Sequence, residues 1–261
     1  MMLSSLLPGV QGVRELGRAL VARAMLRLQQ GQDQAAGDDL LAALRLGRLV
    51  SHGPTLIEGL VGIAVEDLAY VGVKQYLQHA TISADQAKAL RQALLNLPAA
   101  EPMIEKLHAE RFSTLDATTH LARSTPGAEQ ILEINAALRA AMRQADWNET
   151  LKTLNQHYDR FLAIAAMPDR NARSEKMQQY QDELEGMADK YKNPLKLLEE
   201  VGKGDNLPQV LGRLQGEILL SLLMPALGVV QTADDRIRQE ANLVALGVEL
   251  AAYRAEHGSY P

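Results

Sequence analysis

The sequence predicts an all-α protein, and three observations carry this prediction. Apolar residues recur at spacings of three and four along most of the chain, which is the period of an amphipathic helix. No stretch alternates apolar and polar residues over the length of a strand. Capping and breaking residues divide the 261 residues into segments of helical length. We expect a helical array, followed by an antiparallel helical hairpin and a long C-terminal helix.

Composition and charge narrow the classes of function. The net charge is −5 and no segment carries a dense run of Lys and Arg, so we expect no nucleic-acid partner. The absence of cysteine excludes disulfides, thiolate metal sites and cysteine nucleophiles. No uninterrupted apolar run reaches the roughly 18–20 residues that a spanning helix needs. We expect a soluble chain, either cytoplasmic or the soluble part of a membrane-anchored envelope protein.

The first two predicted helices cover residues 14–30 and 34–50. Gly31 lies between them, and glycine is the residue that most often ends a helix. The predicted helices that follow cover residues 56–78, 84–96, 101–123, 128–144 and 147–167. We place the clearest boundary at 124–127, which divides the chain into a repeat-like half, 1–125, and a second half, 126–261.

Residues 53–73 form the most apolar stretch. Thr55 and Glu58 make a capping box, so a helix begins next to them. A helix that is apolar on all sides lies in a protein core or in a membrane. We expect the core, because Glu66 and Asp67 would lie near the middle of a bilayer at a cost of roughly 2.5–3.5 kcal/mol each.

Residues 151–192 carry the clearest periodicity and predict the helical hairpin. The apolar positions alternate by three and four on both sides of a turn at 168–171, which places each set in one seam. They are Leu151, Leu154, Tyr158, Phe161 and Ala165 before the turn, and Met177, Tyr180, Leu184, Met187 and Tyr191 after it. Further on, Pro225 is expected to break the helix that begins near Leu207, and a last helix covers 226–256.

Two glutamates in the apolar stretch are the first candidates for chemistry. Buried carboxylates need a partner or have a raised pKa. We expect Arg45 and Arg48 to be partners of Glu58 and Glu66, which would make a proton-transfer or ligand-binding site with His52 at its rim. Alternatively, Glu58 is only a helix cap, and Glu66 belongs to an ion-paired or exposed edge.

A second candidate is the pair Glu105 and His108. Glu-x-x-His supplies metal ligands in di-iron bundles, but two helices must each contribute one pair. The chain contains no second Glu-x-x-His, so a solvent-exposed face is the competing interpretation. With no phosphate-binding glycine loop and no nucleophile signature, we expect neither a cofactor nor catalysis.

Residues 17–50 resemble a tetratricopeptide repeat, and residues 80–98 resemble its end. Gly31, Ala36, Leu40, Ala43 and Leu44 stand at the spacing of that family's packing positions. Leu20 and Arg48 occupy the places of its early Trp and closing Pro. The resemblance implies a short array of helix pairs that binds a protein or peptide partner on an extended surface.

Two further segments resemble type IV pilins and type II secretion pseudopilins. Residues 53–69 read G-P-T-L-I-E followed by apolar residues, and 246–261 contain L-x-x-Y and end in G-S-Y-P. The resemblance implies cleavage after Gly53, with Glu58 as the assembly glutamate. It also implies that the polypeptide is a piece of a longer protein. Taken together, the sequence favours a non-catalytic scaffold or interaction module; a secretion-related envelope protein and a carboxylate-based enzyme or metal protein are the alternatives.

Overall fold

The structure is a computed structural model that describes residues 2–123, 144–191, 206–223 and 225–261. The boundary predicted at 124–127, the helix predicted at 128–144 up to residue 143, and the segment after Asn193 lie outside these ranges.

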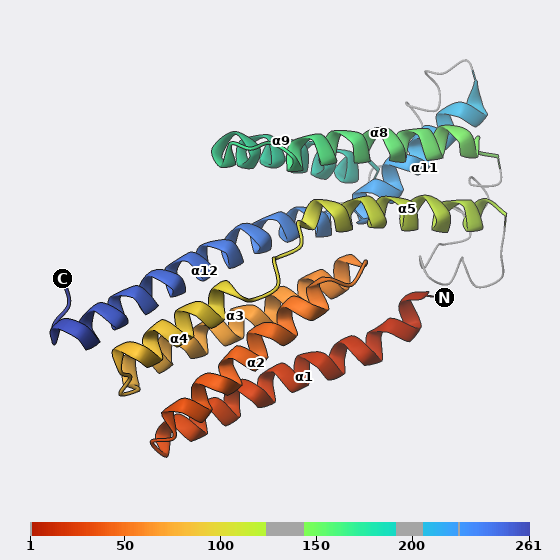
Figure 1. The fold of residues 1–261 in the computed structure, drawn as a ribbon. Helices are drawn as coiled ribbons and strands as arrows, with labels where there is room; N and C mark the ends of the chain where they lie inside the picture. Colours follow the sequence, from red (N-terminus) through yellow and green to blue (C-terminus); the bar gives the residue numbers. More distant parts are fainter. Residues whose placement is uncertain (1, 124–143, 192–205, 224) are drawn as a thin grey trace. The chain divides into compact units, whose positions relative to one another are not determined.

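All secondary structure in the described ranges is α-helical, which confirms the predicted fold class (Figure 1). The helices are α1 (Met2–Gln29), α2 (Asp33–Ser51), α3 (Leu56–His79), α4 (Ala84–Leu95), α5 (Met103–Ala122), α8 (Trp147–Ala165), α9 (Arg170–Tyr191), α11 (Leu207–Leu223) and α12 (Pro225–His257). The first helix begins twelve residues before the predicted start at residue 14, at Met2. The break at Pro225 is where we expected it, with proline at the first position of α12.

Local signals in the sequence act as predicted at the helix ends. Gly31 adopts a φ of 71°, a left-handed conformation that glycine tolerates without strain and that ends α1. The Thr55 hydroxyl accepts a hydrogen bond from the Glu58 amide, and Glu58 accepts one from the Thr55 amide in return. Asp146 caps α8 by accepting a hydrogen bond from the amide of Asn148.

The chain forms two compact units. The first comprises Met1–Lys106 together with Thr232–Pro261, and the second comprises Leu107–Gln231. The last thirty residues therefore belong to the same unit as the first helices, although more than a hundred residues separate them in sequence.

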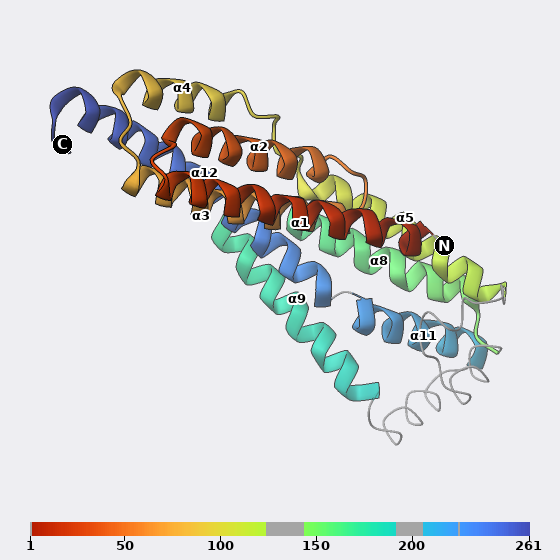
Figure 2. The same cartoon turned by 90° about the horizontal axis from the view of Figure 1, so that it is seen from below.

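Helix α3 is the central element of the first unit and packs against both α1 and α2 (Figures 1 and 2). Its buried residues lie on slightly more than half of its circumference, whereas Ala64, Val71 and Gln75 on the remaining face are exposed, so α3 is not enclosed on all sides as its composition predicts. Glycines let the backbones approach closely. A Cβ on Gly62 would lie 2.6 Å from the carbonyl oxygen of Gly47, so a side chain at either position would collide with backbone.

The C-terminal helix covers α3 and α4 in the same unit. Ile237, Val244, Val248 and Ala251 are buried, and their spacing resembles a coiled-coil seam. Four ion pairs flank this seam. They join Asp67 to Arg236, Lys74 to Glu240, Lys88 to Glu256 and Arg91 to Glu249.

The second unit contains the predicted hairpin. α8 and α9 contact each other across the turn at 166–169, and α11 packs against both. Tyr158 and Tyr180 are almost fully buried, with their hydroxyls bonded to Thr114 and His157, respectively. Of the nine predicted seam residues whose side chains the structure describes, the six buried ones lie in the middle of the two helices: Leu154, Tyr158, Phe161, Met177, Tyr180 and Leu184.

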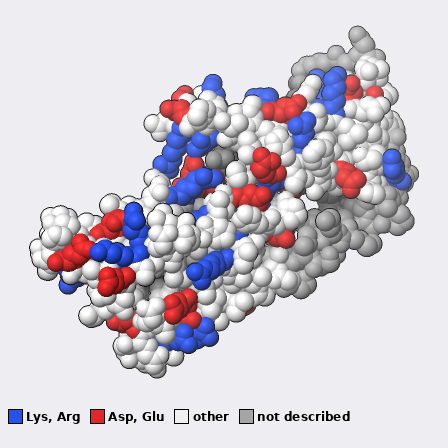
Figure 3. Space-filling view, viewed as in Figure 1, with Lys and Arg blue, Asp and Glu red and all other residues white. Residues whose placement is uncertain are grey.

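Charged side chains of both signs are intermixed on the face shown in Figure 3. In the described ranges, no helix is long and apolar enough to cross a membrane.

Candidate functional site

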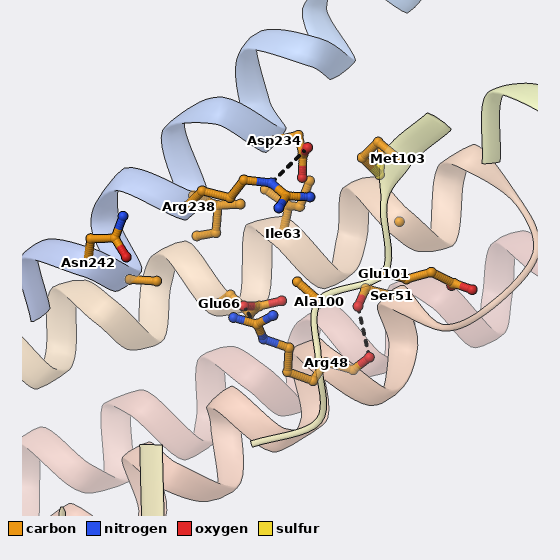
Figure 4. A pocket seen from close by; sticks show the side chains of 13 residues that line it. Arg48, Ser51, Ile63, Glu66, Ala100, Glu101, Met103, Asp234, Arg238 and Asn242 are labelled. Atoms are coloured by element: carbon orange, nitrogen blue, oxygen red, sulfur yellow. Dashed lines mark hydrogen bonds and ion pairs between the residues drawn. The ribbon is translucent and has the colours of Figure 1, made fainter. Parts of the chain in front are cut away.

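A pocket of about 290 Å³ lies in the first unit between α2, α3, α12 and the segment that leads into α5 (Figure 4). Its lining combines charged side chains with small and aliphatic ones. The lining residues are Arg48, Ser51, Gly59, Ile63, Glu66, Ala100, Glu101, Met103, Asp234, Ile237, Arg238, Ala241 and Asn242. α3 supplies the floor because its glycine-rich, apolar sequence places it at the centre of the unit.

The pocket contains a buried ion pair between Glu66 and Arg48. The Nε atom of Arg48 lies 2.8 Å from Oε2 of Glu66, and the two side chains are 12% and 4% exposed. The N–H is not aimed at the oxygen, so these two buried atoms attract each other without a hydrogen bond. Arg48 also donates to the Tyr70 hydroxyl through Nη2, at 3.3 Å. Of the two arginines named from the sequence, Arg48 lies beside Glu66.

Burial raises the pKa of Glu66 to about 7. Removal of the carboxylate from water is the largest cause, because the charged form loses its hydration. The positive charge of Arg48 opposes the shift, and the nearby negative charge of Asp234 adds to it. Glu66 is therefore poised to exchange a proton near neutral pH.

The opposite wall carries a second ion pair. On α12, Nε of Arg238 donates to Oδ2 of Asp234 at 3.1 Å. The side chain of Asp234 is 11% exposed and that of Arg238 is 49% exposed, so this pair lies at the mouth of the pocket. Figure 4 shows Arg238 and Asp234 above Glu66 and Arg48 across the pocket.

Lys106 is a buried residue that stabilises the rim of the pocket. It is only 2% exposed, and its Nζ donates to Oε2 of Glu101 at 2.9 Å and to the carbonyl oxygen of Gly53. These bonds tie the start of α5 to the turn between α2 and α3. They also lower the pKa of Glu101, through the hydrogen bond to the ammonium group.

The other residues that the sequence singled out lie outside the pocket. Glu58 is engaged in the capping box, which matches the alternative interpretation of this residue. Arg45 is exposed. His52 is also exposed, with Nε2 3.1 Å from the carbonyl oxygen of Ala99. The structure therefore brings together two of the five candidates, Arg48 and Glu66.

Glu105 and His108 both project from α5 into solvent. Within the described part of the chain, no three metal-ligating side chains come close enough together to hold a metal ion.

Three charged residues in or beside the pocket were missed from the sequence, namely Lys106, Asp234 and Arg238. Asp234 and Arg238 form an i, i+4 pair, which usually indicates a solvated helix face. The signal that distinguishes them is Ile237 between them, which begins the buried seam of α12. No local pattern shows that this seam packs near Glu66, because the two segments are far apart in the chain.

Chemically, the pocket offers hydrogen-bond donors and acceptors of both charges and one carboxylate that titrates near neutrality. This combination suits the binding of a small charged molecule or the transfer of a proton. Comparison of the chain with protein-family models, curated proteins and solved structures finds no match, so neither the tetratricopeptide nor the pseudopilin resemblance has family support.

Proposed function

We propose that this protein is an interaction module, and that the outer face of α12 binds an amphipathic helix of a partner protein. In the same proposal, α1 to α4 are a tetratricopeptide-like support that holds α12 in place. The support for that part is the burial of the predicted packing residues Ala36, Leu40, Ala43 and Leu44.

A row of exposed apolar side chains on α12 carries the proposal. Leu243, Leu246, Leu250 and Tyr253 are 60%, 57%, 36% and 39% exposed. We call them the α12 stripe. Their spacing of three, four and three places them on one side of the helix, away from the buried seam. A helix with apolar residues on two sides has a second surface that water solvates poorly.

The dimensions of the α12 stripe favour a helical partner. Ten residues of helix span about 15 Å, which is the length of three turns. The spacing is that of a coiled-coil seam, so a partner helix with leucines at matching positions would fill it. Full burial of an aliphatic side chain stabilises a complex by about 1.5–3 kcal/mol. The loss of translational and rotational freedom on association costs about 4–15 kcal/mol. Four side chains therefore predict a weak, reversible complex.

The first test identifies the partner by contact at a defined position. Leu246 is replaced by a photo-crosslinking amino acid in the full-length chain, which is irradiated in its native cells. Ala245 is replaced in the control, since it is exposed on α12 but lies off the stripe. We expect a second protein to be crosslinked at position 246 and not at 245. Crosslinks that are only intramolecular, or that join two copies of this chain, would contradict a distinct partner.

The second test measures the affinity of the purified partner by calorimetry. Leu246→Glu places a charge in the proposed interface and should weaken binding at least about tenfold, because about 1.4 kcal/mol is lost for each factor of ten. Leu26→Glu is the matched control: Leu26 is 54% exposed on α1, outside the stripe. Equal binding by both variants, with helicity unchanged, would reject the α12 stripe as the interface.

A further inference from the structure

We propose that the pocket between α3 and α12 binds a small zwitterion of the α-amino acid type, with the ligand's carboxylate on Arg238 and its ammonium group on Glu66. This inference uses none of the α12 stripe residues. Its failure would therefore not contradict the interaction proposed above, and failure of that interaction would not contradict this inference.

The charges around the pocket match a ligand that carries both signs. Arg48 and Glu66 form one wall, and Asp234 with Arg238 forms the other (Figure 4). The formal charges of these four groups cancel, and the further lining carboxylate, Glu101, is paired with Lys106. A simple anion would be repelled by a carboxylate on either wall, and a simple cation by a guanidinium group on either wall. A zwitterion can turn its carboxylate toward Arg238 and its ammonium group toward Glu66, which is the electrostatic complementarity that gives specificity.

Each wall also offers an unused hydrogen-bonding position. Arg238 bonds Asp234 through Nε alone, and within the described ranges its two terminal nitrogens make no further hydrogen bond. The two terminal nitrogens together can bind a carboxylate end-on, through two parallel hydrogen bonds. Across the pocket, Oε2 of Glu66 is buried and lies 2.8 Å from Nε of Arg48, but it accepts no aligned hydrogen bond. A buried acceptor of this kind gains from any N–H donor that reaches it.

Size and the remaining lining favour an aliphatic amino acid. Water occupies about 30 Å³ per molecule, so the pocket holds roughly ten waters, or a ligand with a similar number of heavy atoms. Leucine has that size. Ile63, Met103 and Ile237 supply apolar surface for a side chain. Arg238 and Asn242 are exposed, so the ligand has access from the α12 side.

Calorimetry on the full-length chain separates the possible ligand classes. L-leucine, N-acetyl-L-leucine and L-leucinamide share one side chain and carry, respectively, both charges, the negative charge and the positive charge. At pH 7.5 we expect leucine to bind at least about tenfold more tightly than either analogue, a difference of about 1.4 kcal/mol. No detectable binding of leucine would overturn the proposal. So would binding of either analogue as tight as that of leucine.

Two substitutions on the same helix test the role of Arg238. Arg238→Gln removes the group assigned to the ligand carboxylate, so leucine should bind at least about tenfold more weakly. Arg236→Gln is the control, because Arg236 pairs with Asp67 and does not line the pocket. Equal leucine affinity in both variants, with the same helicity, would overturn the assignment.

Proton linkage tests the role of Glu66. The charged groups that face it are Arg48, Asp234 and Arg238, with the Tyr70 hydroxyl beside Arg48. An ammonium group favours the ionised carboxylate, so ligand binding releases a proton and affinity for leucine should rise between pH 6 and pH 8. Glu66→Gln should bind leucine more weakly and lose this rise. The same pH dependence in both proteins would overturn the assignment to Glu66.

Discussion

Glu66 is a carboxylate that the fold buries beside a single arginine. It is 3% exposed, and its ion-pair partner Arg48 lies beside it without an aligned hydrogen bond. Burial removes both charges of an ion pair from water, and their mutual attraction compensates for this cost only when the geometry is good. The residue is therefore placed at a cost to stability, and that cost depends on pH.

The stability of the protein should fall as pH rises through the range in which folded Glu66 ionises. Its pKa is about 7 in the folded state against 4.5 for an ordinary glutamate, so the folded state binds more protons between these values. The penalty is absent below about pH 4.5 and reaches about 3 kcal/mol above pH 7. Glu66→Gln should remove this dependence. Urea unfolding of both proteins from pH 4.5 to 8 measures it, and parallel profiles would contradict the shift.

Lys106 illustrates a buried charge with better partners. Replacement by Met keeps the aliphatic stem but removes the bonds to Glu101 and Gly53. We expect the free energy of unfolding to fall by about 1.5–3 kcal/mol, the usual worth of hydrogen bonds to charged groups. Lys152→Met is the control, since Lys152 is 62% exposed and surface changes stay within about 0.5 kcal/mol. Similar losses in the two variants, measured by chemical unfolding, would contradict a role for these bonds.

At the scale of elements, the crossing of α2 and α3 depends on two glycines. Gly47 and Gly62 face each other with backbone against backbone, so neither position has room for a methyl group. The sequence alone does not identify the helix that Gly62 contacts, since that depends on which faces meet after folding.

Gly62→Ala should destabilise the protein by about 1–3 kcal/mol, because a Cβ there would press on the backbone of α2 and overpack the crossing. Gly12→Ala should act in the opposite direction. Gly12 has nothing within 4 Å of its would-be Cβ, so alanine's helix propensity should add up to about 1 kcal/mol. Thermal and chemical unfolding of both variants give the sign. Equal effects would contradict the tight crossing.

At the scale of the whole molecule, the first unit is completed by the far end of the chain. Helix α12 brings a buried seam and four ion pairs to helices that begin more than a hundred residues earlier. It also supplies one wall of the pocket. The stability of α1–α4 and the existence of the pocket therefore depend on the same helix.

Deletion of residues 232–261 should destabilise the first unit severely. Burial of Ile237, Val244 and Val248 is worth about 1.5–3 kcal/mol each, which together approaches the 5–15 kcal/mol that holds a typical domain folded. Deletion of only 258–261 is the control, since those residues are exposed. Limited proteolysis and thermal unfolding compare the two. A first unit that melts at the same temperature in both would contradict the role of α12.

The sequence by itself determined the helices and most of their ends. The capping box at Thr55, the left-handed Gly31 and the break at Pro225 depend on neighbouring residues alone, so local chemistry is sufficient to predict them. The buried middle of the α8–α9 hairpin was likewise predictable, because its partner lies just across a short turn.

Only the tertiary structure decided which predicted residues share a site. Arg48 rather than Arg45 meets Glu66 because the rotation of α2 against α3 is set by packing at Gly47 and Gly62. The apolar stretch 53–73 contributes one wall of the pocket, and α12 contributes the second. That contact joins residues far apart in the chain, and long-range packing energies, unlike caps and turns, leave no local signal in the sequence.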